Sequence, residues 1–292
     1  MTADKTIACG LCPHGCRLAP GQAGICRARA NVGGEIRCLN YGQATALALD
    51  PIEKKPLNRF HPGSRVLSYG SWGCNLSCPF CQNFSISLDF EQARRQAVAL
   101  TPEQLVALAL EQRSRGNIGI AFTYNEPTVS YEFLIDASAL AHDAGLLTVL
   151  VTNGYLNEKP WTRLMTQMDA VNIDLKSATQ TYYDGLGAPQ GLETVKRSIS
   201  IASALTHVEV SFLVVPDGPG GRTDAGEPLP GNDSAREMEE LSAWLASVDP
   251  DIALHLLPFR PRWRLIDRAP ASQATIDGLA HVARAHLKHV YC

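Results

Sequence analysis

The chain has 292 residues, of which 45% are apolar and 19% are charged, and this balance excludes a disordered or fibrous protein. Its formal net charge of -3 argues against dependence on bulk attraction to nucleic acid or to an anionic membrane. Because the chain opens without a leader pattern and holds no apolar run long enough to span a bilayer, we expect a cytoplasmic protein. Thiols stay reduced in the cytoplasm, so the eight cysteines clustered at or before position 81, of nine in the chain, are interpreted first as metal ligands.

Two regions that differ in composition and in hydrophobic periodicity follow each other along the chain. Residues 1–60 are rich in Cys, Gly and Pro and show no sustained periodicity, so they predict an extension that needs a metal to hold it together. After residue 60, short apolar runs alternate with helical patterns, which indicates βα units around a parallel sheet. The sequence therefore predicts two domains, a Cys-rich N-terminal extension over 1–60 and a barrel over 61–292.

The second region predicts an α/β fold, a partial (β/α)6 TIM-like barrel, because its six strands are fewer than the eight of a closed barrel. Thr101, Pro102 and Gln104 predict a capped helix start, and Ser234 with Glu237 predicts a second capping box. The expected strands are Val66–Tyr69, Ile118–Thr123, Leu147–Thr152, Ala170–Asp174, Val208–Val215 and Ala253–Pro258. Other expected elements are helices near Val129–Ala144, Trp161–Met168, Leu192–Leu205, Met238–Ser247 and Ala271–Lys288. The stretch Asp217–Asp233 is expected to be a long loop, and a mobile loop is favoured over a lid.

Cys74, Cys78 and Cys81 follow the first strand in the pattern C-x3-C-x2-C. Three thiolates on one tight loop can hold three irons of a [4Fe–4S] cluster and leave the fourth iron open, whereas electron-transfer clusters normally have four cysteines. The carboxyl end of a barrel strand is also where this fold places its chemistry. The alternative is a zinc ion whose fourth ligand is a residue such as His61.

This loop, with Phe80 before its last cysteine, resembles the cluster loop of the radical S-adenosylmethionine (SAM) enzymes. Its Cys-Gln-Asn ending is similar to the Cys-His-Asn of glycyl-radical activating enzymes such as pyruvate formate-lyase activating enzyme. The segments Cys9–Cys16 and Asp50–Pro56 resemble the AmmeMemoRadiSam-system radical SAM group. The resemblance implies a [4Fe–4S] cluster at which SAM is reductively cleaved to a 5′-deoxyadenosyl radical that removes a hydrogen atom from a substrate. It also makes Phe80 a candidate cofactor contact.

The resemblance further implies which polar residues hold SAM. Glu126 stands where the family has a contact to the methionine ammonium, and Asn153 resembles a ribose or methionine contact. Asp174 and Lys176 resemble the SAM-binding pair of activating enzymes, and strand alternation places them with Asn172 on the face expected inside the barrel. The structural alternatives are a helix cap for Glu126, an ordinary turn for Asn153 and a simple ion pair between Asp174 and Lys176.

A cationic segment follows the sixth strand, where Arg260, Arg262 and Arg264 flank Trp263. Arg260 stands where activating enzymes tend to have His, so the segment departs from the family pattern at that position. The three arginines could grip an anionic substrate or a partner surface. Nucleic acid is the weaker candidate on a chain of negative net charge.

Four cysteines near the N-terminus follow the pattern C-x2-C-x3-C-x9-C. Four soft ligands so close together suit either a structural zinc or a second iron–sulfur cluster, and spacing does not decide between the two metals. Zinc would only hold the segment together, whereas a cluster could pass electrons to the barrel. The terminal Cys292 is expected to be a bystander. The predicted ligands are Cys9, Cys12, Cys16 and Cys26, with Cys38 and His14 in reserve.

Together these patterns predict a radical SAM oxidoreductase that needs a reductant such as flavodoxin or ferredoxin. The resemblance to activating enzymes implies that the reaction is activation of a glycyl-radical enzyme. The alternative is a small-molecule substrate or another protein residue. No membrane partner is expected. A different class, a non-catalytic iron–sulfur or zinc protein for electron transfer or scaffolding, is disfavoured because the cysteine triplet lacks a fourth cysteine.

Overall fold

The computed structural model describes residues 5–222 and 226–292 of the chain. Its centre is an eight-stranded sheet in the order β14-β13-β12-β11-β10-β9-β7-β6, in which the strands from β7 to β13 all run parallel. The strands β14 and β6 lie at opposite edges of the sheet, so the barrel is open. The predicted partial (β/α)6 barrel is therefore confirmed.

All six predicted strands are present, and each bound lies within one residue of the one expected. Their side chains are almost all buried, because helices cover a parallel sheet and its strands then read as continuous apolar runs. The strands are β7 (Arg65–Gly70), β9 (Asn117–Phe122), β10 (Leu147–Thr152), β11 (Ala170–Asp174), β12 (His207–Val214) and β13 (Ala253–Pro258).

The predicted helices are also present, with local differences; α5 (Glu158–Met165), for example, lies three residues earlier than the expected Trp161–Met168. The capping box of Thr101 is confirmed, but Glu237 does not complete one with Ser234, because its carboxylate turns inward to accept from Ser177 Oγ and Ala178 N. The last helix is shorter than expected. The helices after the strands are α3 (Pro102–Glu111), α4 (Tyr131–Asp143), α5 (Glu158–Met165), α7 (Gly191–Ser203), α8 (Ala235–Val248) and α9 (Gln273–Ala283).

Several short elements were not expected from the sequence. The most consequential is β6 (Ala46–Pro51), which lies within residues 1–60 yet pairs antiparallel with β7 at the edge of the barrel sheet. The division of the chain at residue 60 stays a prediction. The other short elements are β1 (Ile7–Ala8), β2 (Arg17–Leu18), β3 (Arg29–Val32), β4 (Glu35–Cys38), β5 (Gln43–Ala44), β8 (Val98–Ala99), β14 (Val290–Tyr291), α1 (Phe84–Ser87), α2 (Glu91–Gln96) and α6 (Gln180–Gly185), with 3-10 turns at Ile52–Lys54, Arg113–Arg115, Pro127–Ser130 and Trp263–Leu265.

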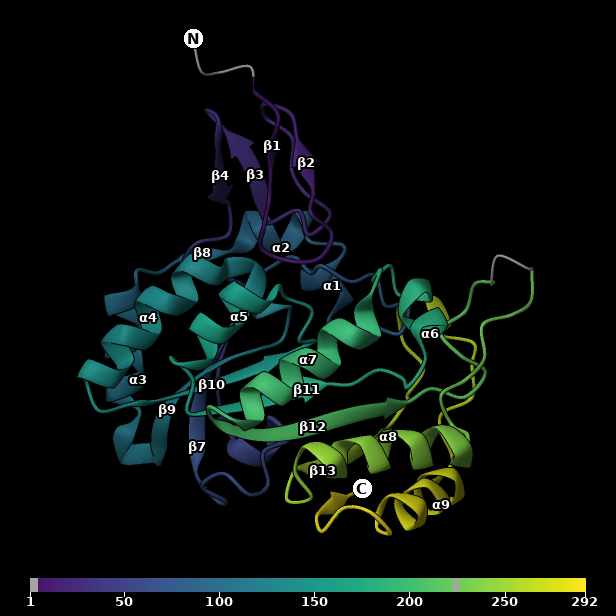
Figure 1. The fold of residues 1–292 in the computed structure, drawn as a ribbon. Coiled ribbons are helices and arrows are strands. Elements are labelled where there is room, and N and C mark those ends of the chain that lie inside the picture. The colour runs from purple at the N-terminus through teal and green to yellow at the C-terminus, as the bar shows by residue number, and fades with distance from the viewer. Residues whose placement is uncertain (1–4, 223–225) are drawn as a thin grey trace.

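The hairpins β1–β2 and β3–β4 project from one end of the barrel, with α2 at their base (Figure 1). In the predicted loop over 217–233, Asn232 accepts from Val215 N and donates to Lys176 O, which fixes the end of the loop. Residues 223–225 of that loop lie outside the described residues, and its mobility stays a prediction. Among the described residues, no helix combines the length and apolar character needed to cross a membrane.

Candidate active site

A single cavity of about 730 Å³ opens where the parallel strands end. In barrels of this kind the carboxyl ends of the strands carry the chemistry. The loops after β7, β9, β10, β11 and β13 all contribute to its walls. The structure therefore brings the separately predicted residues together around one space. Those that line it are Cys74, Cys78, Phe80, Cys81, Glu126, Asn153, Asn172, Asp174, Lys176, Arg260 and Arg262.

The cysteine triplet lies on a loop that the rest of the fold holds in place. Cys81 N donates to Cys78 O over 3.1 Å within the loop, and Ser77 N donates to Leu186 O over 2.9 Å. Burial raises the pKa of Cys78 to about 12, against the opposing effect of Lys176. Metal binding must therefore displace the thiol protons. Three thiols facing one cavity fit the protein ligands of a [4Fe–4S] cluster with an open iron.

The zinc alternative finds no support in this geometry. His61, its suggested fourth ligand, does not line the cavity and packs edge-on against Phe60 with ring centroids 4.7 Å apart. Within the described ranges, no three His, Cys, Asp or Glu side chains are spaced to hold a single metal ion.

Glu126 is both a turn cap and a wall of the cavity. Its Oε1 accepts from Thr128 N, Thr128 Oγ1 and Thr152 Oγ1, and its Oε2 accepts from Asn153 N over 2.8 Å. Burial raises the pKa of Glu126, and the hydrogen bonds from Asn153, Thr152 and Thr128 oppose that effect. The predicted cap is thus present, while Oε2 keeps capacity for a further donor.

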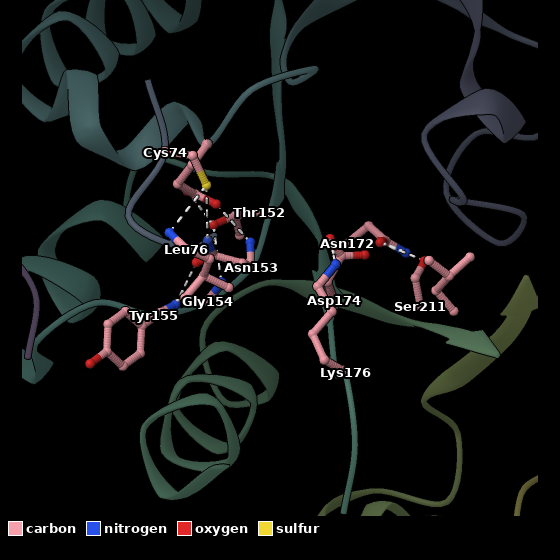
Figure 2. Close-up of polar contacts among 12 residues, drawn as sticks. Cys74, Leu76, Thr152, Asn153, Gly154, Tyr155, Asn172, Asp174, Lys176 and Ser211 are labelled. Carbon is pink, nitrogen blue, oxygen red and sulfur yellow. Dashed lines mark hydrogen bonds and ion pairs between the residues drawn. The ribbon is translucent and has the colours of Figure 1, made fainter. Parts of the chain in front are cut away.

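Asn153 connects the end of β10 to the cysteine loop. Its Nδ2 donates to Asn75 Oδ1 over 2.8 Å and lies 3.9 Å from Cys74 Sγ, while its Oδ1 accepts from Tyr155 N. Figure 2 shows this amide beside Cys74 and the backbone of Leu76, which donates to the same sulfur. Because both polar atoms of the Asn153 amide are engaged, the side chain positions the loop next to the cavity.

Asp174 and Lys176 form an ion pair with 2.8 Å between Oδ2 and Nζ. Burial alone would lower the pKa of Lys176, but Asp174 and Cys78 raise it above its ordinary value, so the amine is charged. Deeper on the same strand, Asn172 accepts from Ser211 Oγ over 2.8 Å (Figure 2) and donates to Pro56 O. The predicted inward face of β11 is therefore polar throughout.

A buried ionic cluster beside the cavity was missed from the sequence. Asp50 Oδ2 accepts from Lys55 Nζ over 2.7 Å, Ser68 Oγ over 2.9 Å and Tyr124 Oη over 2.6 Å, and Asp50 Oδ1 accepts from Lys54. Although burial alone would raise it, the pKa of Asp50 is held well below its usual range by these donors. The charged run Asp50–Pro56 was the sequence feature that could have indicated this cluster. Lys54 and Pro56 of that run line the cavity, as does Tyr124, which contacts the run from the loop after β9.

The three arginines after β13 divide into two groups. Arg260 and Arg262 line the cavity and are exposed, and neither has a polar partner among the described residues. Arg264 instead lies over the Trp263 ring at 4.4 Å, and Trp263 stacks on Phe84 with centroids 5.5 Å apart. Two free guanidinium groups therefore face the cavity mouth.

The N-terminal cysteines lie outside this site. Cys9, Cys12, Cys16 and Cys26 line a separate small cavity together with His14, whereas Cys38 does not line it. Cys292 is exposed at the C-terminus, far from any of these residues in the sequence.

Comparisons of the sequence and the fold with known proteins indicate which family has this cavity and cysteine loop. A family model described as the Radical SAM superfamily matches residues 71–222. The chain is 34% identical over 291 residues to the uncharacterized protein MJ0808 of Methanocaldococcus jannaschii, covering 99% of this chain and 81% of that protein.

Two solved structures are similar in fold. QueE from Escherichia coli aligns with a TM-score of 0.50 at 14% identity, over 85% of this chain and 92% of QueE. SuiB of Streptococcus suis, bound to the precursor peptide SuiA, aligns with a TM-score of 0.50 at 12% identity. That alignment covers 75% of this chain and 46% of SuiB, so this chain spans less than half the length of SuiB.

The matched residues 71–222 contain the cysteine triplet and the strands from β9 to β12. Enzymes of the matched family use a [4Fe–4S] cluster and SAM, and they cleave SAM to a radical at that cluster. The cavity supplies three thiols for such a cluster and polar side chains beside them. This chain belongs to the radical SAM superfamily.

Proposed function

We propose that this chain is an activating-enzyme-like radical SAM enzyme that removes a hydrogen atom from a substrate at the mouth of its cavity. The observation that carries the proposal is that the cysteine triplet shares one cavity with Glu126, Asn153 and the Asp174–Lys176 pair. The cluster and SAM, when bound, supply the one-electron cleavage. The residues of the chain bind and orient both groups and keep water out.

Each polar residue is assigned a distinct task. Glu126 Oε2, with its remaining acceptor capacity, receives the methionine ammonium. The charged Lys176 binds the methionine carboxylate, and Asp174, which is one-third exposed, accepts from a ribose hydroxyl. Phe80 is buried in the cavity wall and gives SAM an apolar surface. Asn153 holds the loop of Cys74 in place.

The substrate side of the cavity is cationic. Arg260 and Arg262 are free of partners in the described structure, so they favour a substrate that carries negative charge near the abstracted hydrogen. The resemblance to activating enzymes makes a segment of a glycyl-radical protein the first candidate for this substrate. SuiB, which has been solved with a precursor peptide, shares the fold. The electron comes from an external reductant, for which flavodoxin or ferredoxin is proposed.

The reaction can be tested without knowing the substrate. Anaerobically purified protein, reduced with dithionite in the presence of SAM, is expected to form 5′-deoxyadenosine, measured by chromatography. Cys78→Ala removes a cluster ligand and is expected to abolish that product, while the matched control Cys292→Ala keeps it. Wild-type protein with a full complement of iron that forms no 5′-deoxyadenosine would contradict the proposal.

The substrate is tested separately by adding a glycyl-radical protein, chosen from the genes beside the one for this chain if they include one. With that protein present, electron paramagnetic resonance is expected to detect a glycyl radical that depends on SAM. SAM cleavage without any protein radical would instead support a small-molecule substrate, and it would leave the cleavage reaction itself intact.

A further inference from the structure

A second cavity lies among the N-terminal cysteines and is separate from the active site. Cys9 N donates to Cys16 O over 2.8 Å where the β1–β2 hairpin ends, and the bridge between Ala23 and Ala30 brings Cys26 to the same place. Cys9 and Cys26 are 8% and 9% exposed, so their thiols face the interior. The residues that line this cavity are Cys9, Leu11, Cys12, His14, Cys16, Gly24, Cys26, Arg29, Asn75 and Val129.

Arg29 gives this cavity a buried positive charge. The residue is 6% exposed, and its two Nη atoms donate to the Glu132 carboxylate over 2.7 and 2.6 Å. Its Nε is buried and has no partner among the described residues. A buried N–H without an acceptor is destabilising, so its place in the cavity wall calls for an anionic or acceptor group there.

The other two candidate ligands are accounted for differently. The Cys38 thiol donates to Asn40 Oδ1 over 3.1 Å and lies outside the cavity wall. His14 lines the cavity, but its Nε2 lies 2.7 Å from Asn75 O. Because a carbonyl oxygen can only accept, Nε2 carries the proton and donates to the loop of Cys74, which leaves Nδ1 with a free lone pair. Metal-binding histidines commonly make this second hydrogen bond, so His14 stays a reserve ligand. Four cysteines complete a tetrahedral ligand set without it.

We infer that Cys9, Cys12, Cys16 and Cys26 form a closed four-thiolate metal centre and that Arg29 is its buried counter-charge. A divalent ion with four thiolates keeps two net negative charges, and a guanidinium beside the sulfurs offsets them. Zinc and an iron–sulfur cluster share this chemistry. Among the described residues no three such side chains are spaced around a single ion, so a zinc ion here would require the four sulfurs to move closer together. The inference does not rest on the proposed function.

The centre is docked on the barrel through polar contacts. His14 reaches the backbone of Asn75, whose side chain donates to Tyr155 O and accepts from Asn153. The side chain of Asn157, at the start of α5, donates to Gly10 O over 2.8 Å, and its backbone N–H donates to Leu11 O over 3.0 Å. A metal that stiffens the Cys9–Cys16 turn therefore also supports the loop that carries Cys74.

The experiment removes the active-site ligands so that only the second centre can hold metal. The background is the Cys74→Ala, Cys78→Ala, Cys81→Ala triple variant of the full chain, purified without oxygen. Iron, zinc and acid-labile sulfide are measured per folded chain, with folding checked by circular dichroism. We expect about one zinc, or about four irons with sulfide, per chain. Either metal supports the centre, and a folded triple variant without stoichiometric metal overturns it.

Added substitutions test the ligand set. In the triple-variant background, Cys12→Ser or Cys26→Ser is expected to abolish metal binding, whereas Cys38→Ser keeps it. Titration with Co²⁺ provides a second readout, because a tetrahedral thiolate site gives intense visible bands on protein that is already folded. Equal loss of metal from Cys38→Ser and Cys12→Ser would overturn the assignment of the four ligands.

Arg29 is tested by the rate at which metal passes to a chelator. Arg29→Gln is expected to retain the metal but to release it about tenfold faster, as is typical when a residue outside the ligand set is removed. Glu132→Gln breaks the same ion pair and keeps the cavity cation, so its release rate should not rise. Arg37→Gln, on exposed β4, is the surface control. Equal release from Arg29→Gln and Arg37→Gln overturns the counter-charge role.

Discussion

Glu209 shows how much one buried carboxylate can organise at a distance from the chemistry. It lies on β12 with no exposed surface, and its oxygens accept from His207, His255 and the backbone N–H groups of Asn58 and Arg59. Burial alone would raise its pKa, but these donors lower the pKa of Glu209 to about 2. The side chain thereby ties the segment before β7 to the base of the barrel.

This residue makes the stability of the protein depend on pH in a specific window. A pKa of about 2 instead of 4.5 corresponds to on the order of 3 kcal/mol of unfolding free energy at neutral pH. Because the folded pKa is lowered, that stability is present above pH 4.5 and is lost as the pH falls toward 2. Glu209→Gln should flatten the fall of the unfolding free energy over this window, measured by urea denaturation at several pH values.

The control for this prediction is Glu240→Gln, which removes an exposed carboxylate paired with Arg236 on one helix. It should leave the pH profile of wild type almost unchanged, because exposed pairs contribute little. Parallel profiles for Glu209→Gln and wild type between pH 5 and 2 would show that Glu209 is not the titrating group.

Among the elements, the loop after β7 begins at a tightly packed glycine. Gly73, immediately before Cys74, has a φ of +91°, and a Cβ added there would lie 2.6 Å from Cys26 O and 3.2 Å from Ala28 Cβ. The N-terminal segment therefore packs directly against the start of the cysteine loop, and only glycine provides both the backbone angle and the space.

Gly73→Ala is expected to reduce the unfolding free energy by about 2–4 kcal/mol through strain and overpacking, and to lower the iron bound per chain. Gly63→Ala is the matched control, since Gly63 has a φ of +82° but nothing within 4 Å of an added Cβ. Thermal unfolding and iron analysis measure both effects. If the two variants lose equal stability and equal iron, then backbone strain alone explains the result and the contact with Cys26 does not matter.

At the scale of the whole molecule, residues 1–60 and the barrel share strand pairing and polar contacts. The strand β6 extends the barrel sheet, Lys55 and Asp50 reach Tyr124, and Asn157 holds the backbone of Gly10. We therefore expect a single cooperative unfolding transition for the chain. Calorimetry of the metal-free protein counts the unfolding transitions. Hydrogen exchange then shows whether residues 9–12 and β12 open with the same free energy. Two separated transitions would favour independent domains that divide near residue 60.

The barrel strands were predictable because strands covered on both sides are continuous apolar runs, such as Leu147–Thr152. The strand β6 was missed because Ala46–Pro51 lies in a Cys-rich region and ends in a charged residue and a proline, and its pairing with β7 is a tertiary property. The two residues of β14 carry no pattern that a sequence window can detect.

The cavity residues were predictable where a motif marked them, as with the cysteine triplet, or where a polar residue ended an apolar strand, as with Asn153 and Asp174. The cluster around Asp50 was not, because its partners come from two other segments, Ser68 from β7 and Tyr124 from the loop after β9. The hydrogen bond that the Glu237 carboxylate accepts from Ser177 was likewise not predictable from the sequence. The local spacing favoured a capping box, and Ser177 lies on a loop that is distant in the sequence.

The anchoring of the cysteine loop has a consequence for the positions of its three sulfurs. Asn125 donates to Gly73 O at the start of the loop, and Leu186 O accepts from Ser77 N at its middle. The positions of the three sulfurs therefore depend in part on residues of two other loops that are not ligands themselves. A substitution that breaks either contact can misplace the sulfurs even though all three cysteines remain in the chain.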